Sequence, residues 1–181
     1  MKVIDHPERF RTGTRVLFLK ARNKDGCTDQ RTLMGISHDV EQFDRRLDEL
    51  VAAVRPGERI YASAGPRSMS SAMRVFKERQ LAADYDGDPE AFYRSIKTSW
   101  ASCLMAPRAQ DGKVWLFDCD EPADAERVEA ELAEHYDRDV EPYRYTTKSG
   151  AHIVVAPFNK ARLSDGVRAL IHDNPLMLWG Y

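Results

Sequence analysis

Residues 115–120 constrain the fold most, because they read WLFDCD, an apolar run that ends in two aspartates. Such a run predicts a buried strand. Alternation along a strand points Asp118 and Asp120 to the same face. Two carboxylates side by side repel each other unless a cation lies between them. The segment therefore predicts a strand whose end holds a divalent metal ion.

A second segment carries complementary chemistry. Residues 147–155 read TKSGAHIVV, with a turn-forming Ser149-Gly150 pair followed by His152 on an apolar strand. Backbone N–H groups around Ser149 and Gly150 can form a concavity that binds anions. A histidine near a triphosphate can donate a hydrogen bond to it, and its charge follows the local field. Together the two segments predict a site where a divalent metal and a phosphate meet.

Length and composition bound the class of protein. The chain has 181 residues, 43% of them hydrophobic, which supports one domain with a real core over residues 1–181. The net charge of −2 gives no global basic field for nucleic acid, although a local groove can still be basic. No apolar run approaches the ~20 residues that cross a bilayer. We expect no membrane segment.

The cysteines indicate a reducing compartment. Cys27, Cys103 and Cys119 lie far apart, with no CxxC pair and no Cys/His cluster. This spacing argues against a structural zinc site. Scattered thiols in an odd number fit the cytoplasm better than a disulfide framework. We therefore expect a cytoplasmic protein.

Periodicity and turn signals predict the order of elements. Strands are expected over residues 15–20, 32–36, 59–63, 114–120, 143–147, 152–157 and 176–181, with a turn at 23–26. Helices are expected over residues 39–54, 66–83, 88–105, 123–135 and 164–172. Without the helical stretch at 66–105, the order is that of the ferredoxin-like, split βαβ arrangement. The prediction is an α+β fold: an antiparallel ferredoxin/RRM-like sheet, helices on one face, and a helical insertion at about 66–105.

The two motifs, an apolar strand ending in Asp-x-Asp and then Ser-Gly-x-His on a later strand, resemble the catalytic core of archaeo-eukaryotic primases and primase-polymerases. The resemblance implies an RRM-like core in which Asp118 and Asp120 bind catalytic Mg²⁺ or Mn²⁺. It also implies that Ser149 and His152 hold the triphosphate of an incoming nucleotide, with Lys148 beside them as a further contact. The implied activity is metal-dependent transfer of nucleotides to a single-stranded or primed nucleic acid, in DNA replication or repair.

The chain departs from the family in one respect that bears on catalysis. Two metal ions about 3.5–4 Å apart normally need a third acidic ligand besides two carboxylates. The best candidate is Asp173, in a segment that reads more naturally as a helix end than as a strand, and Asp165 is a poorer one. The alternative function is therefore a catalytically inactive primase-like module that binds nucleotide, nucleic acid or a protein partner.

Other interpretations of the same residues stay open. Asp118 and Asp120 are also placed to cap the next helix, and residues 148–150 also read as an ordinary hairpin turn. Arg67 begins a helix in the segment GPRS, where it either binds phosphate or only caps. The basic residues Arg74, Lys77 and Arg79 form either a solvated helix face or a path along a nucleic-acid backbone.

Two further classes of protein fit less well. An RNA-binding RRM domain needs aromatic residues in an RNP1-type run on the sheet, and no such run occurs in the chain. The FDCD segment also looks like the nucleophile motif of haloacid-dehalogenase phosphatases. That family needs a Rossmann-like body with a later lysine and acidic pair, and it has no place for Ser-Gly-x-His.

Overall fold

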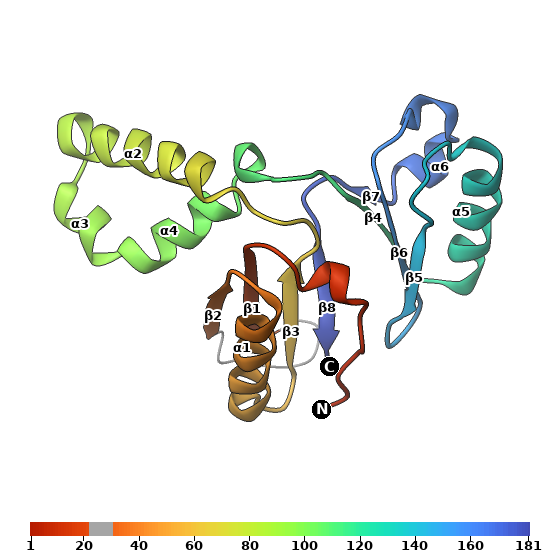
Figure 1. The fold of residues 1–181 in the computed structure, drawn as a ribbon, viewed down its shortest axis with the longest axis horizontal. Helices are drawn as coiled ribbons and strands as arrows, with labels where there is room; N and C mark the ends of the chain where they lie inside the picture. The colour runs from red at the N-terminus through yellow and green to blue at the C-terminus, as the bar shows by residue number, and fades with distance from the viewer. Residues whose placement is uncertain (22–30) are drawn as a thin grey trace.

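The computed structural model describes residues 1–21 and 31–181, which form an α+β structure with two four-stranded antiparallel sheets (Figure 1). The first sheet has the strand order β2-β1-β3-β8 and the second has the order β5-β6-β4-β7. The α+β class and the antiparallel pairing predicted from the sequence are confirmed. The strands are divided between two sheets because β8, from the end of the chain, pairs with β3.

The strands are β1 Arg15–Ala21, β2 Thr32–Ser37, β3 Glu58–Ser63, β4 Trp115–Cys119, β5 Tyr143–Thr146, β6 Ala151–Val155, β7 Ile171–His172 and β8 Leu176–Gly180. The helices are α1 Val40–Ala53, α2 Met69–Asp86, α3 Pro89–Arg94, α4 Ile96–Leu104, α5 Pro122–His135 and α6 Asp165–Arg168. Most expected elements therefore lie within a few residues of their predicted bounds.

Helix α1 covers one face of the first sheet. Asp39 caps it as predicted, because its side chain accepts a hydrogen bond from the Gln42 N–H. The periodic apolar residues of α1 include Phe43 and Leu50, which are buried against β1, β3 and β8. Burial of this stripe, more than helix propensity, stabilises the helix. The opposite face of the first sheet is left for other parts of the chain.

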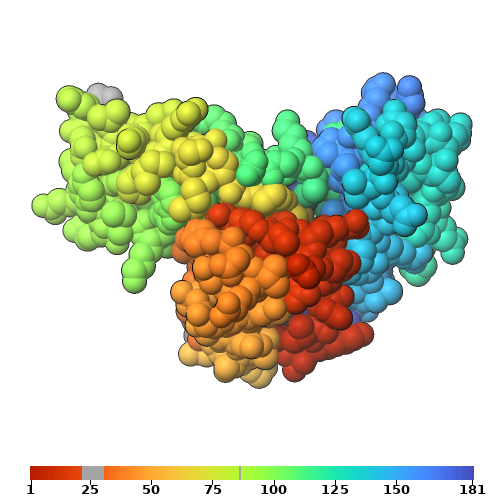
Figure 2. Space-filling model, in the orientation of Figure 1, coloured from red at the N-terminus to blue at the C-terminus, as the bar shows by residue number. Residues whose placement is uncertain are grey.

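The segment α2–α4 forms a helical arm that projects away from both sheets (Figure 1). A small cluster that includes Val16, Ala72 and Leu104 fixes the base of the arm on β1. The single helix expected over 88–105 is broken at Ser95, whose hydroxyl donates to the carbonyls of Ala91 and Phe92. Such back-bonding competes with the helix, which explains the break. In Figure 2 the arm and the second sheet are two lobes on either side of the N-terminal part.

The second sheet has two different faces. Helices α5 and α6 cover one face through a cluster that includes Phe117, Val128 and Ile153. Alternation turns Leu116, Tyr145 and Val154 to the other face, where they join the core of the first sheet. Helices thus lie on one face of this sheet, and the other face, expected to be free, is partly covered by the first sheet.

The segment 164–172 differs from its prediction. The helix there is limited to α6, and residues 171–172 form β7, which pairs with β4 through Phe117↔Ile171. The Asp118 N–H also donates to the Leu170 carbonyl at 3.1 Å. Pairing with the open edge of β4 satisfies backbone groups that would otherwise be orphaned, so it overrides the local helical pattern. The expectation of a helix end before Asp173 is therefore wrong.

Two predictions concern residues outside the described part of the chain, the turn at 23–26 and Cys27. Within residues 1–21 and 31–181, the search for a helix with the length and hydropathy of a membrane span finds none.

The β5–β6 turn lies directly against the end of β4. A Cβ atom on Gly150 would stand 1.9 Å from the Cys119 carbonyl oxygen and 2.8 Å from the carbonyl carbon of Asp120. Since no side chain fits there, only glycine allows the turn to approach so closely. This contact brings the turn, with Lys148 and Ser149, next to the two aspartates.

We predict that Gly150→Ala destabilises the protein by about 1–3 kcal/mol, because the added methyl must push the turn away from β4. Urea unfolding of the purified variant measures the change in free energy. Ser149→Ala, one residue earlier on the exposed side of the turn, is the control and should change stability by less than about 0.5 kcal/mol. Equal stability of Gly150→Ala and wild type would contradict the close approach.

Candidate functional site

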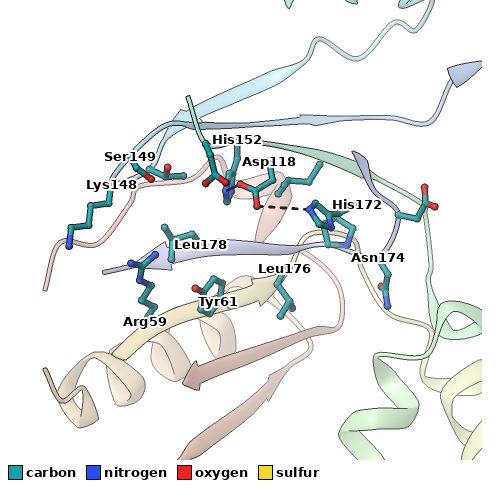
Figure 3. A pocket seen from close by; sticks show the side chains of 15 residues that line it. Arg59, Tyr61, Asp118, Lys148, Ser149, His152, His172, Asn174, Leu176 and Leu178 are labelled. Atoms are coloured by element: carbon teal, nitrogen blue, oxygen red, sulfur yellow. Dashed lines mark ion pairs between the residues drawn. The ribbon is translucent and has the colours of Figure 1, made fainter. Parts of the chain in front are cut away.

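A cavity of about 370 Å³ lies between the two sheets (Figure 3). Side chains from β3 and β8 of the first sheet line it on one side. Side chains from β4, β6 and the β5–β6 turn of the second sheet line it on the other. The residues after β7 close one end. Its polar lining residues are Arg59, Tyr61, Asp118, Asp120, Thr147, Lys148, Ser149, His152, His172, Asp173 and Asn174. The volume suits a small molecule.

The structure brings five of the six predicted site residues to this cavity. Asp118 lies on β4 directly opposite His152 on β6, and Asp120 follows the end of β4. Lys148 and Ser149 come from the β5–β6 turn. This convergence follows from the antiparallel pairing of β4 with β6, the second strand of the hairpin.

Asp118 is engaged by both histidines of the cavity. Its Oδ1 atom lies 2.9 Å from His152 Nε2, and its Oδ2 atom lies 3.9 Å from His172 Nε2 (Figure 3). The Asp118 side chain is 41% exposed, so it remains open to solvent on the cavity side. Without a ligand, the histidines offset the repulsion expected between the carboxylates of Asp118 and Asp120.

Tyr145 sets the orientation of the His152 ring. The Leu178 N–H donates to Tyr145 Oη at 3.2 Å, and Oη lies 2.7 Å from His152 Nδ1. Burial raises the pKa of Tyr145, so the hydroxyl keeps its proton and can donate it to Nδ1. The proton of a neutral His152 then resides on Nε2, from which it is donated to Asp118. The ring thus presents an N–H group to the cavity.

Two cationic side chains line the same cavity. Arg59 extends from β3 and Lys148 extends from the β5–β6 turn, on the side of the cavity away from His172 and Asn174 (Figure 3). The Ser149 hydroxyl and the backbone of the turn add hydrogen-bonding groups. The cavity therefore combines carboxylates, histidines, cationic side chains and hydroxyl groups in one lining.

Asp173, the best candidate for a third carboxylate, lies just after β7 and lines the same cavity. Its carboxylate is paired with Lys160, 3.3 Å from Nζ. Asn174 beside it donates to the Met105 carbonyl and accepts from the Gln110 side chain, which ties the base of the helical arm to this end of the cavity. Asp165 lies elsewhere, in α6, paired with Arg168.

Arg67, the sixth predicted site residue, is placed differently. It is 3% exposed, its N–H donates to the Thr14 carbonyl, and it does not belong to the cavity lining found among the described residues. Its burial lowers the guanidinium pKa to about 10. The GPRS segment does start a helix, with Ser68 as the cap that accepts from the Ser71 N–H. This favours the capping interpretation of the segment.

Sequence reasoning missed Arg59, Tyr61, Tyr145 and His172 as site residues. Arg59 and Tyr61 were within the strand predicted at 59–63, but only the pairing of β3 with β8 places them beside the second sheet. His172 was within the candidate third motif, and its assignment to a helix concealed its position beside β4.

Comparisons of the chain with protein-family models, curated proteins and solved structures find no match. In residues 1–21 and 31–181, no group of three or more His, Cys, Asp or Glu side chains is arranged to hold a metal ion.

We predict that Tyr145→Phe weakens the preference of His152 for the Nε2–H tautomer, because Nδ1 loses its donor and only Asp118 still favours a proton on Nε2. Nitrogen-15 NMR of labelled histidines measures the tautomer through the shifts of both ring nitrogens. Loss of the buried hydroxyl should also cost about 1–3 kcal/mol of unfolding free energy, since Leu178 N–H and His152 Nδ1 lose their partner.

Tyr143→Phe is the matched control, because Tyr143 Oη bonds to His6 at 3.1 Å instead. This variant loses a hydroxyl from the same strand and should leave the His152 tautomer unchanged. A wild-type His152 with its proton on Nδ1 would refute the assignment, and so would an unaltered His152 spectrum in Tyr145→Phe.

Proposed function

We propose that the cavity between the sheets binds a nucleoside triphosphate with a divalent cation, and that the chain is a primase-polymerase-like nucleotidyltransferase. One observation carries the proposal: a single cavity of about 370 Å³ is lined by Asp118 and Asp120 together with Lys148 and Arg59. Carboxylates suit Mg²⁺ or Mn²⁺, and the cationic groups suit phosphate. The resemblance of the two motifs to primases agrees with this combination.

The donor set fits one substrate-borne cation. Mg²⁺ is usually bound by one or two carboxylates together with substrate phosphates and waters, not by an all-protein cage. The described residues offer Asp118 and Asp120, without a closed group of three ligands. These two aspartates would hold the cation, and Asp173 is within the same cavity as a further oxygen ligand if its pair with Lys160 opens.

The remaining groups would position and neutralise the phosphates. His152 presents an Nε2–H donor that Tyr145 holds in place, and Lys148 and Arg59 supply positive charge in the same cavity. When bound, the cation would stabilise the charge on the attacking and leaving oxygens of nucleotide transfer. Catalysis of this kind rests on positioning and electrostatics. The acceptor would be a single-stranded or primed nucleic acid, as in replication or repair.

A second candidate is the inactive module that binds nucleotide, nucleic acid or a protein without transfer. Specific contacts favour it: Asp118 is engaged by two histidines and Asp173 by Lys160. Each of these contacts has to break before the carboxylate can coordinate a metal ion. Under this candidate the cavity binds its ligand through Lys148 and Arg59 alone, so binding would not depend on the metal.

For either candidate we propose a cytoplasmic location. Cys103 and Cys119 are both buried free thiols in the described structure, as a reducing compartment allows.

We predict that wild-type protein binds ATP in the presence of Mn²⁺. Asp118→Asn/Asp120→Asn should weaken this binding by more than about 100-fold, because loss of direct metal ligands costs more than loss of groups that only hydrogen-bond to a ligand. Titration calorimetry, with and without Mn²⁺, provides the measurement. Asp111→Asn/Asp139→Asn changes the net charge equally at two exposed positions and should bind like wild type.

Absence of Mn²⁺-dependent ATP binding by folded wild-type protein would sink the proposed function. An ATP affinity that changes neither with Mn²⁺ nor with the Asp118/Asp120 substitutions would support the inactive module instead. If binding follows the metal, incorporation of labelled nucleotide on primed and unprimed templates separates transfer from binding alone.

A further inference from the structure

The helical arm α2–α4 buries little of its own apolar surface. Among the residues from 76 to 100 whose burial is described, none is buried. The Phe76 ring packs against Phe92 at 5.3 Å and against Trp100 at 5.8 Å between ring centres, and all three side chains stay partly exposed. Helices in proteins are stabilised mainly by burial of an apolar face. The outer part of the arm therefore lacks packing that a partner could supply.

Helix α2 carries apolar residues on two opposite sides. Ala72 and Val75 are buried on its inner side. The period of 3.6 residues places Met73, Leu81 and Tyr85 on its outer side, where they are 42%, 54% and 82% exposed. A helix that is apolar on both sides is normally buried on both sides. The outer side of α2 therefore has the composition of an interface, and Figure 2 shows α2 at the surface of the arm.

The charges of α2 are arranged against its own dipole. Arg74 and Lys77 are exposed in the first half of the helix, where Glu78 is paired with Arg108. Asp84 is exposed in the last turn, where the negative end of the helix dipole disfavours a carboxylate. The first turn has no acidic residue and the last turn has no basic one. An antiparallel helix laid alongside would therefore complement both ends of α2.

The exposed residues on this side of the helix are together called the outer face of α2: Met73, Arg74, Lys77, Leu81, Asp84 and Tyr85.

The outer face of α2 is complementary to itself. Arg74 and Asp84 are each five residues from Arg79 in the sequence, and Met73 and Tyr85 are each six residues from it. A two-fold axis at the level of Arg79 would set Arg74 opposite Asp84 of the partner subunit in an antiparallel pair. The same axis would set Met73 opposite Tyr85 of the partner subunit. Arg79 itself donates to the Ser102 hydroxyl at 2.9 Å within the arm, so two cations do not meet at the axis.

A second copy of this chain fits the outer face of α2 best. The matched spacing of Arg74 with Asp84 and of Met73 with Tyr85 is complementary to the same helix run in the opposite direction. A nucleic-acid backbone would meet Asp84 as well as the two cations, so it matches the face less well. We propose that the outer face of α2 joins two copies of this chain as an antiparallel helix pair. Dimerisation does not require the proposed function, since the cavity between the sheets is lined by other residues.

Sedimentation-velocity ultracentrifugation of the full chain over a range of concentrations measures the dimer. Arg74→Asp would place a carboxylate opposite the partner's Asp84 at both symmetric contacts, and Asp84→Arg would place two cations there. We expect each variant to raise the dissociation constant of the dimer at least about tenfold, because like charges across an interface are costly. Leu81→Gln/Tyr85→Gln, which removes apolar contacts, should have an effect of at least the same size.

An equimolar mixture of Arg74→Asp and Asp84→Arg should recover the dimer, because opposite charges then meet at both contacts. Recovery would also show that neither variant is misfolded. Lys97→Asp is the control, since it reverses an exposed charge on α4, away from the outer face of α2. This control should dimerise like wild type.

A wild type that stays monomeric at about 100 μM overturns the inference, because an interface of micromolar affinity is almost fully formed at that concentration. A dimer that Lys97→Asp weakens as much as Arg74→Asp also overturns it. So does a mixture of Arg74→Asp and Asp84→Arg that remains as monomeric as either variant alone.

Discussion

The Tyr145 hydroxyl is the contact on which the candidate site depends. It accepts the Leu178 N–H from the first sheet at 3.2 Å and contacts His152 Nδ1 in the second sheet at 2.7 Å. One buried group thus joins the two sheets and orients the histidine that faces Asp118. The His6 side chain reinforces the junction by bonding to the Leu178 carbonyl at 2.8 Å. An unpaired buried polar group lowers the stability of the fold. These hydrogen bonds therefore favour the one arrangement of the sheets in which all of them form.

The mixture of charges in the cavity follows from this arrangement. The second sheet supplies the carboxylates, the histidines and Lys148, and the first sheet adds Arg59 and Tyr61. The cavity is complete only where the two sheets meet. The pairs of Asp118 with His152 and of Asp173 with Lys160 are alternatives to a bound cation. A cation that binds these aspartates would therefore have to break both pairs.

Local signals were sufficient to predict the class of fold and most of its elements. Asp39 as a helix cap and the hairpin at Ser149-Gly150 are examples, because each depends on neighbours in the sequence. The division into two sheets was not predictable, since it depends on the last strand pairing with β3. For the same reason β7 was assigned to a helix: its stabilisation comes from the edge of β4, far away in the sequence. The Asp118–His152 alignment was predictable from motif and pairing, whereas Arg59 was not.

The most direct test of the central claim is a crystal structure of the protein with Mn²⁺ and a non-hydrolysable ATP analogue, using the anomalous signal of manganese to locate the ion. We expect one manganese peak bounded by the carboxylates of Asp118 and Asp120. The phosphates should lie between that ion and the Lys148 and Arg59 side chains. An ordered analogue bound elsewhere, or a cavity with Asp118 still paired to His152 at saturating ligand, would contradict the account.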